Sequence, residues 1–227
     1  VTNSEGAGAS QSHSMIALAA SNGFRGAYRT SRFTVGASVI AGEGLNMVRG
    51  HEYTSKRFVA DMDDLATIGR IAGERTVARL NPRRPKTARV PVVFDRRVSR
   101  MLVAAIASAV NGAAVTRDTS FLKDRMGERI ACDAFTIIDD PFRERAPASH
   151  PFDGEGIAGA PLTVVEGGVL KSWLLDCRSA RQLGLKSTGH AARGAGSAPS
   201  PASSNLYLAP GTLSRDELIA KIGTGLL

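Results

Sequence analysis

The first third of the chain alternates short apolar runs with turn-forming residues. Apolar stretches at Met15–Ala20 and Phe33–Ala41 are each followed by a turn signal, Ser21–Gly23 and Gly42–Gly44 respectively. Asn46–Phe58 fits a third extended segment. Strands joined by short glycine-containing turns typically pair with their neighbours in sequence. The pattern therefore predicts an antiparallel meander of strands.

A helix is predicted to follow the meander. Asp61–Asp64 offers an N-cap and places negative charge near the positive end of the helix dipole. The helix should extend from Leu65 to Leu80 and stop at Asn81–Pro82, because proline disfavours a helical conformation in the residue before it. Residues 1–89 are accordingly predicted to be a meander plus a helix, at the end of an N-terminal domain or at its junction.

The pattern changes in the middle of the chain. Val90–Phe94 is a continuous apolar run, which predicts a buried strand. After Asp95, the segment Met101–Val110 is rich in alanine and has almost no polar face. It is therefore predicted to be a helix buried on most sides, ending at Asn111–Gly112.

The last part returns to short strands. Ala134–Ile138 reads as a strand, and Leu162–Val165 with Val169–Leu175 gives a hairpin signal about two glycines. Residues 189–204 are dominated by Gly, Ala, Ser and Pro and are predicted to be a mobile loop. Further elements are expected as a short helix over Arg178–Leu183, a strand over Asn205–Leu208, and a final helix capped by Ser214.

These elements define the fold class. We expect an α+β protein with antiparallel sheets, in a meander and hairpins, packed with a buried central helix and a few shorter helices. The second predicted domain covers residues 90–227. With 227 residues and 43% hydrophobic residues, the chain can bury a sizeable core.

Composition bears on the cellular location of the protein and on its charged partners. No apolar run approaches the ~20 residues that span a bilayer, and no signal peptide is visible. Two cysteines, Cys132 and Cys177, are too few for a disulfide framework. A cytoplasmic location is the simplest expectation. The net charge of +8 could attract nucleic acid, but without a dense basic run or interleaved aromatic residues a solvated surface is favoured.

Few residues suggest chemistry by themselves. His51–Glu52 lacks the second histidine of a metal-binding helix and lies in a predicted strand. Asp153 and Glu155, on a glycine-rich loop, could bind a cation or transfer protons, but acids capping neighbouring backbone are favoured. His190 starts the 189–204 segment and could be a ligand or proton shuttle, while Cys177 is expected to be a core thiol. The residues alone therefore predict no catalytic set and no metal site.

Several longer motifs resemble one known family. They are, in order, Pro91–Phe94, Asn111–Gly112, Thr119–Asp124, Thr136–Pro141, Pro151–Gly156, Trp173–Asp176 and Thr188–Ala191. In sequence and order they are similar to the TldD/PmbA family, also called peptidase family U62 or modulator of DNA gyrase. The residues within these motifs and their order favour the PmbA (TldE) branch of the family. The resemblance implies that an N-terminal domain and a C-terminal end are missing from this chain.

The resemblance also implies which subunit of a heterodimer holds the catalytic metal. In TldD-like members the central helix carries HExxxH, which holds the metal. The corresponding positions here are Val103, Ala104 and Ser108, and none of these side chains is a suitable metal ligand or base. This chain would then be the non-catalytic subunit of a heterodimeric metalloprotease that acts on unfolded or extended peptides. It would have no cofactor of its own, and zinc would sit in a TldD-like partner subunit.

The resemblance and the loop chemistry together give the candidate site. Asp153, Glu155, His190 and Asn205 are the predicted substrate-binding residues. The other hypotheses are a basic nucleic-acid- or gyrase-associated binding protein and an autonomous metallopeptidase that uses Asp153, Glu155 and His190. A homodimer is a further arrangement of the subunits.

Overall fold

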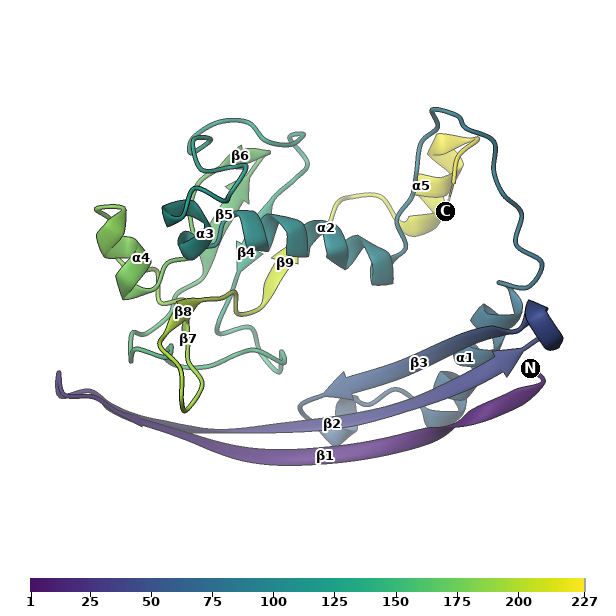
Figure 1. Cartoon of the computed structure of the whole chain (residues 1–227), viewed down its shortest axis with the longest axis horizontal. Helices are drawn as coiled ribbons and strands as arrows, with labels where there is room; N and C mark the ends of the chain where they lie inside the picture. The colour runs from purple at the N-terminus through teal and green to yellow at the C-terminus, as the bar shows by residue number, and fades with distance from the viewer. Residues whose placement is uncertain (227) are drawn as a thin grey trace. The chain divides into compact units, whose positions relative to one another are not determined.

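The computed structural model describes residues 1–226, which divide into two compact units (Figure 1). The first unit comprises residues 1–16, 27–87 and 145–147. The second comprises residues 17–26, 88–144 and 148–227. The predicted domain boundary between residues 89 and 90 stays a prediction.

The first unit is built on a three-stranded sheet. Its strands are β1 (Asn3–Ala19), β2 (Arg25–Ala41) and β3 (Val48–Lys56), in that order across the sheet. β2 and β3 are antiparallel, with Phe33 opposite Lys56 and Ala41 opposite Val48. Two short 3-10 helices follow the second and third strands, η1 (Gly44–Asn46) and η2 (Val59–Asp61). β1 therefore forms one edge of this sheet.

One helix, α1 (Leu65–Val77), packs on β3. Its buried residues Ile68, Ala72 and Thr76 recur every four positions and so share one face. Gly50 of β3 lies directly under Thr76, where any Cβ would collide with the threonine hydroxyl. Asp64 caps the helix by accepting a hydrogen bond from the backbone N–H of Thr67 at 2.8 Å. The predicted N-cap segment and helix start are thus confirmed, but the helix ends at Val77, before the predicted Leu80.

The second unit contains a four-stranded antiparallel sheet. Its spatial order is β6-β5-β4-β9. The strands are β4 (Ile137–Asp139), β5 (Leu162–Glu166), β6 (Val169–Leu170) and β9 (Leu206–Leu208). The hydrophobic core of this unit includes Ile137, Val164, Val165, Leu170, Trp173 and Leu174. The predicted hairpin is present, with a second strand shorter than expected.

Backbone geometry explains the tight hairpin between β5 and β6. Gly167 and Gly168 both have positive φ, 51° and 78°, as a two-residue hairpin turn requires. A side chain at Gly168 would also meet the carbonyl oxygen of Ala131. Only glycine satisfies both the dihedral angle and the space at this position.

The central helix differs from its prediction. α2 (Arg96–Ala109) is capped by Asp95, but Ala109 is its only buried residue. Ser99, Val103 and Ile106 are half-buried, and Met101 and Ala104 are exposed. The helix is therefore not buried on most sides. Alanine content alone could not show this, because the small apolar side chain of alanine is common both in the core and on the surface of proteins.

The segment before this helix also differs from its prediction. Val90–Phe94 makes no strand within the described residues, only an isolated bridge between Val92 and Leu226. Val92 and Phe94 are each 48% exposed. A short apolar run can form a strand, a helix segment or a loop. In this protein the run is a loop with exposed side chains.

The exposure of Ala104 gives a first test. Ala104→Glu should change the free energy of unfolding by less than about 0.5 kcal/mol, because the new carboxylate remains in water. Ala109→Glu, on the same helix, should cost roughly 3 kcal/mol or more, since Ala109 is buried among apolar side chains. Thermal or urea unfolding of the two variants measures both values. Equal losses would contradict an open Ala104 face.

Shorter elements complete the second unit. Asn111–Gly112 does not simply end α2: Asn111 is the N-cap of α3 (Gly112–Thr116), and its Oδ1 accepts from Ala113 N at 3.0 Å. α4 (Cys177–Gln182) and α5 (Arg215–Ile222) match the two predicted helices, and Ser214 forms a capping box with Glu217. Segment 189–204, predicted as a loop, contains a small hairpin of β7 (Ala191–Ala192) and β8 (Ser200–Pro201).

The predicted α+β class with antiparallel sheets is confirmed by this architecture. Within residues 1–226, no helix combines the length and the apolar character that crossing a membrane requires.

Candidate functional site

The candidate site begins where β4 ends. Asp139 is the last residue of this strand and is completely buried. Its carboxylate accepts hydrogen bonds from the backbone N–H and the hydroxyl of Ser204, just before β9. Because β4 pairs with β9, the sheet itself brings these two residues together. Asp139 was not selected from the sequence, although it lies in the Thr136–Pro141 motif.

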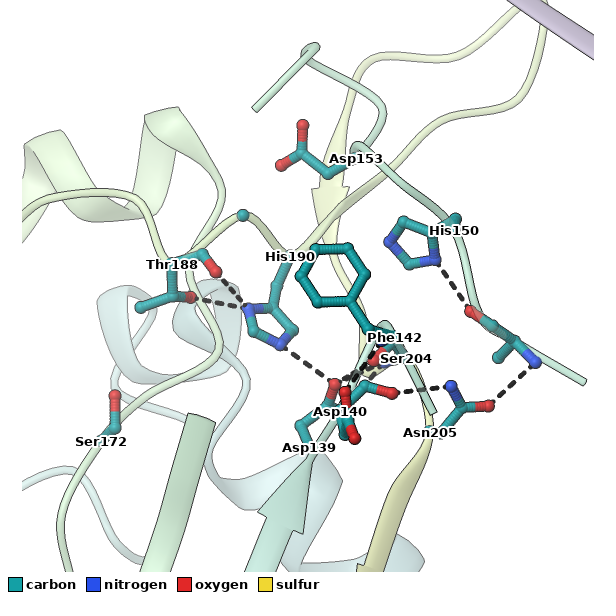
Figure 2. A network of polar contacts seen from close by, with 12 residues as sticks. Asp139, Asp140, Phe142, His150, Asp153, Ser172, Thr188, His190, Ser204 and Asn205 are labelled. Carbon is teal, nitrogen blue, oxygen red and sulfur yellow. Dashed lines mark hydrogen bonds and ion pairs between the residues drawn. The ribbon is translucent and has the colours of Figure 1, made fainter. Parts of the chain in front are cut away.

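His190 faces the same carboxylate (Figure 2). Its Nε2 lies 3.2 Å from Oδ1 of Asp139, and both side chains are almost completely buried. Its Nδ1 lies 2.7 Å from the carbonyl oxygen of Thr188, with the Thr188 hydroxyl at 2.9 Å. A carbonyl oxygen only accepts, so Nδ1 carries a hydrogen. The ring is thus held through Nδ1 by Thr188, and its Nε2 lies beside the Asp139 carboxylate at the end of β4.

The order of these groups argues against nucleophilic catalysis. In a serine hydrolase the histidine contacts the serine hydroxyl and the acid orients the histidine. Here Asp139 lies between the other two, so the Ser204 hydroxyl donates to the carboxylate and not to the imidazole. Asp139 and His190 are also buried, which keeps these two side chains away from a substrate, and Ser204 is half-buried. The arrangement is suited to holding two loops together.

Asp153 has a similar bracing role on the next loop. Its Oδ1 accepts from the backbone N–H groups of Glu155 and Ile157, each at 2.9 Å. Its Oδ2 accepts from the backbone N–H of Ala191 at 3.0 Å, and the side chain is buried. The carboxylate therefore caps its own turn and attaches it to β7. Capping of neighbouring backbone was the favoured sequence interpretation of this residue.

Glu155 and Asn205 make corresponding contacts elsewhere. Oε2 of Glu155 accepts from Cys177 N at 2.8 Å, at the first turn of α4. Asn205 Oδ1 accepts from Ala148 N at 2.9 Å, and its Nδ2 donates to the Asp140 carbonyl at 2.7 Å. All four predicted residues thus connect loops of the second unit. The sequence located them but could not show that their polar atoms are directed at the protein's own backbone.

Cys177 is a half-buried thiol at the start of α4, whereas a core thiol was expected. Burial, followed by the neighbouring Glu155 carboxylate, raises the pKa of the Cys177 thiol to about 11. At neutral pH the group is therefore almost entirely protonated, and the thiol is a poor nucleophile. Cys132 is exposed and, like Cys177, is free of disulfide bonding.

The described residues offer no ready metal centre. Val103, Ala104 and Ser108 lie on α2 as predicted, and the Ser108 hydroxyl donates to the Ala104 carbonyl. Within residues 1–226, no three side chains from His, Cys, Asp and Glu are grouped so that they could hold a metal ion. His51 and Glu52 lie in β3, where Glu52 pairs with Arg75. Neither the three α2 residues nor His51 and Glu52 fit a catalytic metal site.

The fold and site define a class of α+β protein in which buried polar side chains brace glycine-rich loops beside an antiparallel sheet. Comparison identifies the family. The model of the PmbA/TldA metallopeptidase central domain matches residues 1–80, and that of the C-terminal domain matches residues 87–227. The chain belongs to the PmbA/TldA metallopeptidase family.

Individual relatives agree with this assignment. The chain is 34% identical over 227 residues to the metalloprotease PmbA of Escherichia coli O157:H7, covering all of this chain and 48% of that protein. A TldD homologue from Buchnera aphidicola is 32% identical over 127 residues, covering 56% of this chain and 26% of that protein. The chain thus spans about half the length of the curated PmbA relative it matches.

Solved structures show the same fold. A Bacteroides thetaiotaomicron protein that carries the name modulator of DNA gyrase has a TM-score of 0.87 and 27% identity, covering 97% of this chain and 48% of that one. TldE from Thermococcus kodakarensis has a TM-score of 0.82 over 97% of this chain and 50% of that one. At 20% identity, the TldE comparison supports the fold alone.

Proposed function

We propose that this chain is part of the non-metal subunit of a TldD/PmbA-type metallopeptidase that acts on unfolded or extended peptides. The observation that carries the proposal is α2. The helix is present in a family named for metallopeptidases, yet Val103, Ala104 and Ser108 occupy the positions of HExxxH. A zinc-bound, TldD-like homologous subunit would supply the metal chemistry.

An autonomous metallopeptidase is less well supported. The two carboxylate oxygens of Asp153 accept hydrogen bonds from three backbone N–H groups, and Oε2 of Glu155 accepts one from a fourth. His190 uses Nδ1 on Thr188 and faces Asp139 with Nε2. Using Asp153, Glu155 and His190 as ligands would require these loops to lose their bracing contacts. A metallopeptidase needs a bound ion to polarise the peptide carbonyl and activate water.

The outer face of α2 suggests how the partner subunit binds. Val98, Met101 and Leu102 are 46%, 66% and 47% exposed, and their spacing places them on one helix face. Phe94 adjoins this row in sequence and is 48% exposed. We call Phe94, Val98, Met101 and Leu102 the α2 stripe. Contiguous exposed apolar side chains are typical of protein interfaces, and a homologous subunit is the proposed occupant.

The bracing residues are proposed to support substrate binding indirectly. Asp153, His190 and Asn205 hold loops that surround the β7–β8 hairpin. Residues 192–198 of this hairpin are exposed and include Gly194 and Gly196. Glycine lets another backbone approach closely, which suits an extended peptide. The contact surface would then be the hairpin, with Asp153, Glu155, His190 and Asn205 fixing its position.

Reconstitution tests the proposal. The purified full chain alone should not cleave an unstructured peptide, whereas mixing it with a TldD-like homologue from the same genome should give chelator-sensitive cleavage well above that of either protein alone. Met101→Lys with Leu102→Lys should abolish the gain, because two charges on the α2 stripe oppose burial in an interface. Leu185→Lys is the matched control, since Leu185 is 52% exposed and outside the stripe.

Two outcomes would contradict this function. One is robust, chelator-sensitive cleavage by the full chain alone, and the other is full activity of the homologue without it. The nucleic-acid hypothesis predicts instead a DNA affinity that falls steeply with salt. Many of the basic side chains are already in ion pairs, including Arg70, Arg75, Arg125, Arg129 and Arg145, so we expect only weak binding to DNA.

A further inference from the structure

The first unit has an unprotected sheet edge. β1 is 17 residues long and lies at the end of the order β1-β2-β3. Every residue from Asn3 to Met15 is exposed, and α1 packs on β3 at the opposite edge. Natural sheets usually blunt such edges with proline, lysine or inward charges. β1 contains no proline, lysine or arginine, and its one charged side chain, Glu5, pairs with Arg49. Within the described residues, the outer edge of β1 has no partner strand and can pair with another chain.

An apolar groove lies beside this edge. Its volume is about 500 Å³, within the range of about 300–1,000 Å³ typical of ligand sites. Three parts of the first unit line the groove. They are Ala9–Gln11 of β1, Phe33–Val35 of β2, and the stretch from η2 to the first residue of α1, which contributes Val59 and Met62–Leu65. Val59 and Leu65 are 63% and 62% exposed, so the groove leaves apolar surface in contact with water.

The charge of the groove is opposite to that of the whole chain. The chain carries a net charge of +8, yet the charged residues that line the groove are Asp63 and Asp64, with no cation among them. Hydrogen bonds from Thr67 lower the pKa of the Asp64 carboxyl, which therefore stays ionised at neutral pH. Asp63 is exposed and makes no ion pair or side-chain hydrogen bond within the described residues. A ligand with a positive charge would complement this end of the groove.

We propose that the β1 edge and this groove bind an extended polypeptide by strand addition. Main-chain hydrogen bonds to β1 provide affinity, and a large apolar side chain of the ligand fills the groove. A lysine or arginine two positions further on faces Asp63, because alternate residues of a strand project from the same face. The inference deepens the proposed function by naming a preferred peptide, but the binding itself requires neither cleavage nor the partner subunit.

Direct binding of a labelled peptide to the purified full chain tests the proposal. The probe is a short Ser/Thr/Gly peptide with blocked ends and a central Leu-Thr-Lys, followed by fluorescence anisotropy at low salt. Replacing its leucine by serine, or its lysine by glutamate, should weaken binding about tenfold or more. Methylating alternate backbone nitrogens on the pairing side should abolish binding, since those N–H groups can no longer donate to β1.

Charge exchange on the protein sharpens the test. Asp63→Lys should weaken binding of the Leu-Thr-Lys peptide about tenfold and strengthen binding of the Leu-Thr-Glu peptide. Glu43→Lys is the matched control, because Glu43 is also exposed, makes no side-chain contact within the described residues, and lies outside the groove. Leu65→Ser should likewise weaken binding, and Leu45→Ser should leave it unchanged, because Leu45 is fully exposed away from the groove.

Several results would overturn the proposal. They are no measurable binding of the Leu-Thr-Lys peptide, equal binding of the backbone-methylated peptide, and equal effects of Asp63→Lys and Glu43→Lys. The experiment is separable from reconstitution. Peptide binding without reconstituted cleavage would refute only the subunit role, whereas reconstituted cleavage without peptide binding at β1 would refute only this site.

Discussion

Asp139→Ala is expected to lower the free energy of unfolding by about 2–4 kcal/mol, because it removes a buried acceptor and leaves its hydrogen-bond donors unpaired. Asp139 is the shared acceptor for Ser204 and the neighbour of His190 Nε2. Its loss leaves the Ser204 hydroxyl and backbone N–H without their acceptor, and the buried His190 imidazole without its neighbour. Urea unfolding followed by circular dichroism measures the change.

Glu144→Ala is the matched control for this result. Glu144 is an exposed carboxylate close in sequence, with no ion pair or side-chain hydrogen bond within the described residues, so its loss should change stability by less than about 0.5 kcal/mol. The double variant Asp139→Ala with His190→Ala should be clearly less destabilised than the sum of the two single variants, because the two side chains are direct neighbours and the first substitution already removes their contact. A loss equal to that of Glu144→Ala would show that the buried pair does not hold the two loops together.

Asp153→Ala is expected to cost roughly 2–4 kcal/mol, because three backbone N–H groups lose their acceptor in a buried site. These belong to Glu155, Ile157 and Ala191. The substitution removes one hydrogen bond between the 153–157 turn and β7, leaving the one from Gly154 N to the Ala191 carbonyl oxygen. It should therefore also reduce reconstituted peptide cleavage, if the β7–β8 hairpin contacts the substrate.

Comparison of variants separates bracing from direct substrate contact. Asp153→Asn keeps one side-chain oxygen acceptor and should recover part of both stability and cleavage. Asp124→Ala, at an exposed carboxylate, should change neither. If Asp153→Ala left the unfolding free energy unchanged but removed cleavage, Asp153 would contact the substrate directly and the bracing role would be wrong.

Local sequence signals predicted local structure well. Capping residues and turn glycines act within a few positions of themselves, so Asp64 and Ser214 marked helix starts, and Gly167–Gly168 marked a hairpin. The same locality made Asn111–Gly112 ambiguous. Asn111 caps the following helix, because its side-chain oxygen is placed to accept from Ala113, and the sequence alone did not distinguish this from a helix end.

Burial was harder to predict than helix or strand. The alanine-rich α2 and the apolar run before it both suggested a core. The structure leaves the α2 stripe in contact with water, whereas Ala109 at the end of the same helix joins a core that also includes strand residues, Trp173 and Leu174. Hydrophobicity makes a segment suitable for burial, but which segment is buried depends on what lies opposite it.

The sequence by itself determined the family, through motifs in a fixed order, and the absence of metal-binding side chains at Val103, Ala104 and Ser108, because residue identity alone decides what can ligate. It also located Asp153, Glu155, His190 and Asn205. Only the tertiary structure decided their contacts. Asp139 and His190 are separated by fifty positions and meet because β4, β9 and the 188–190 loop converge, and a pairing between distant segments leaves no local signal in either one.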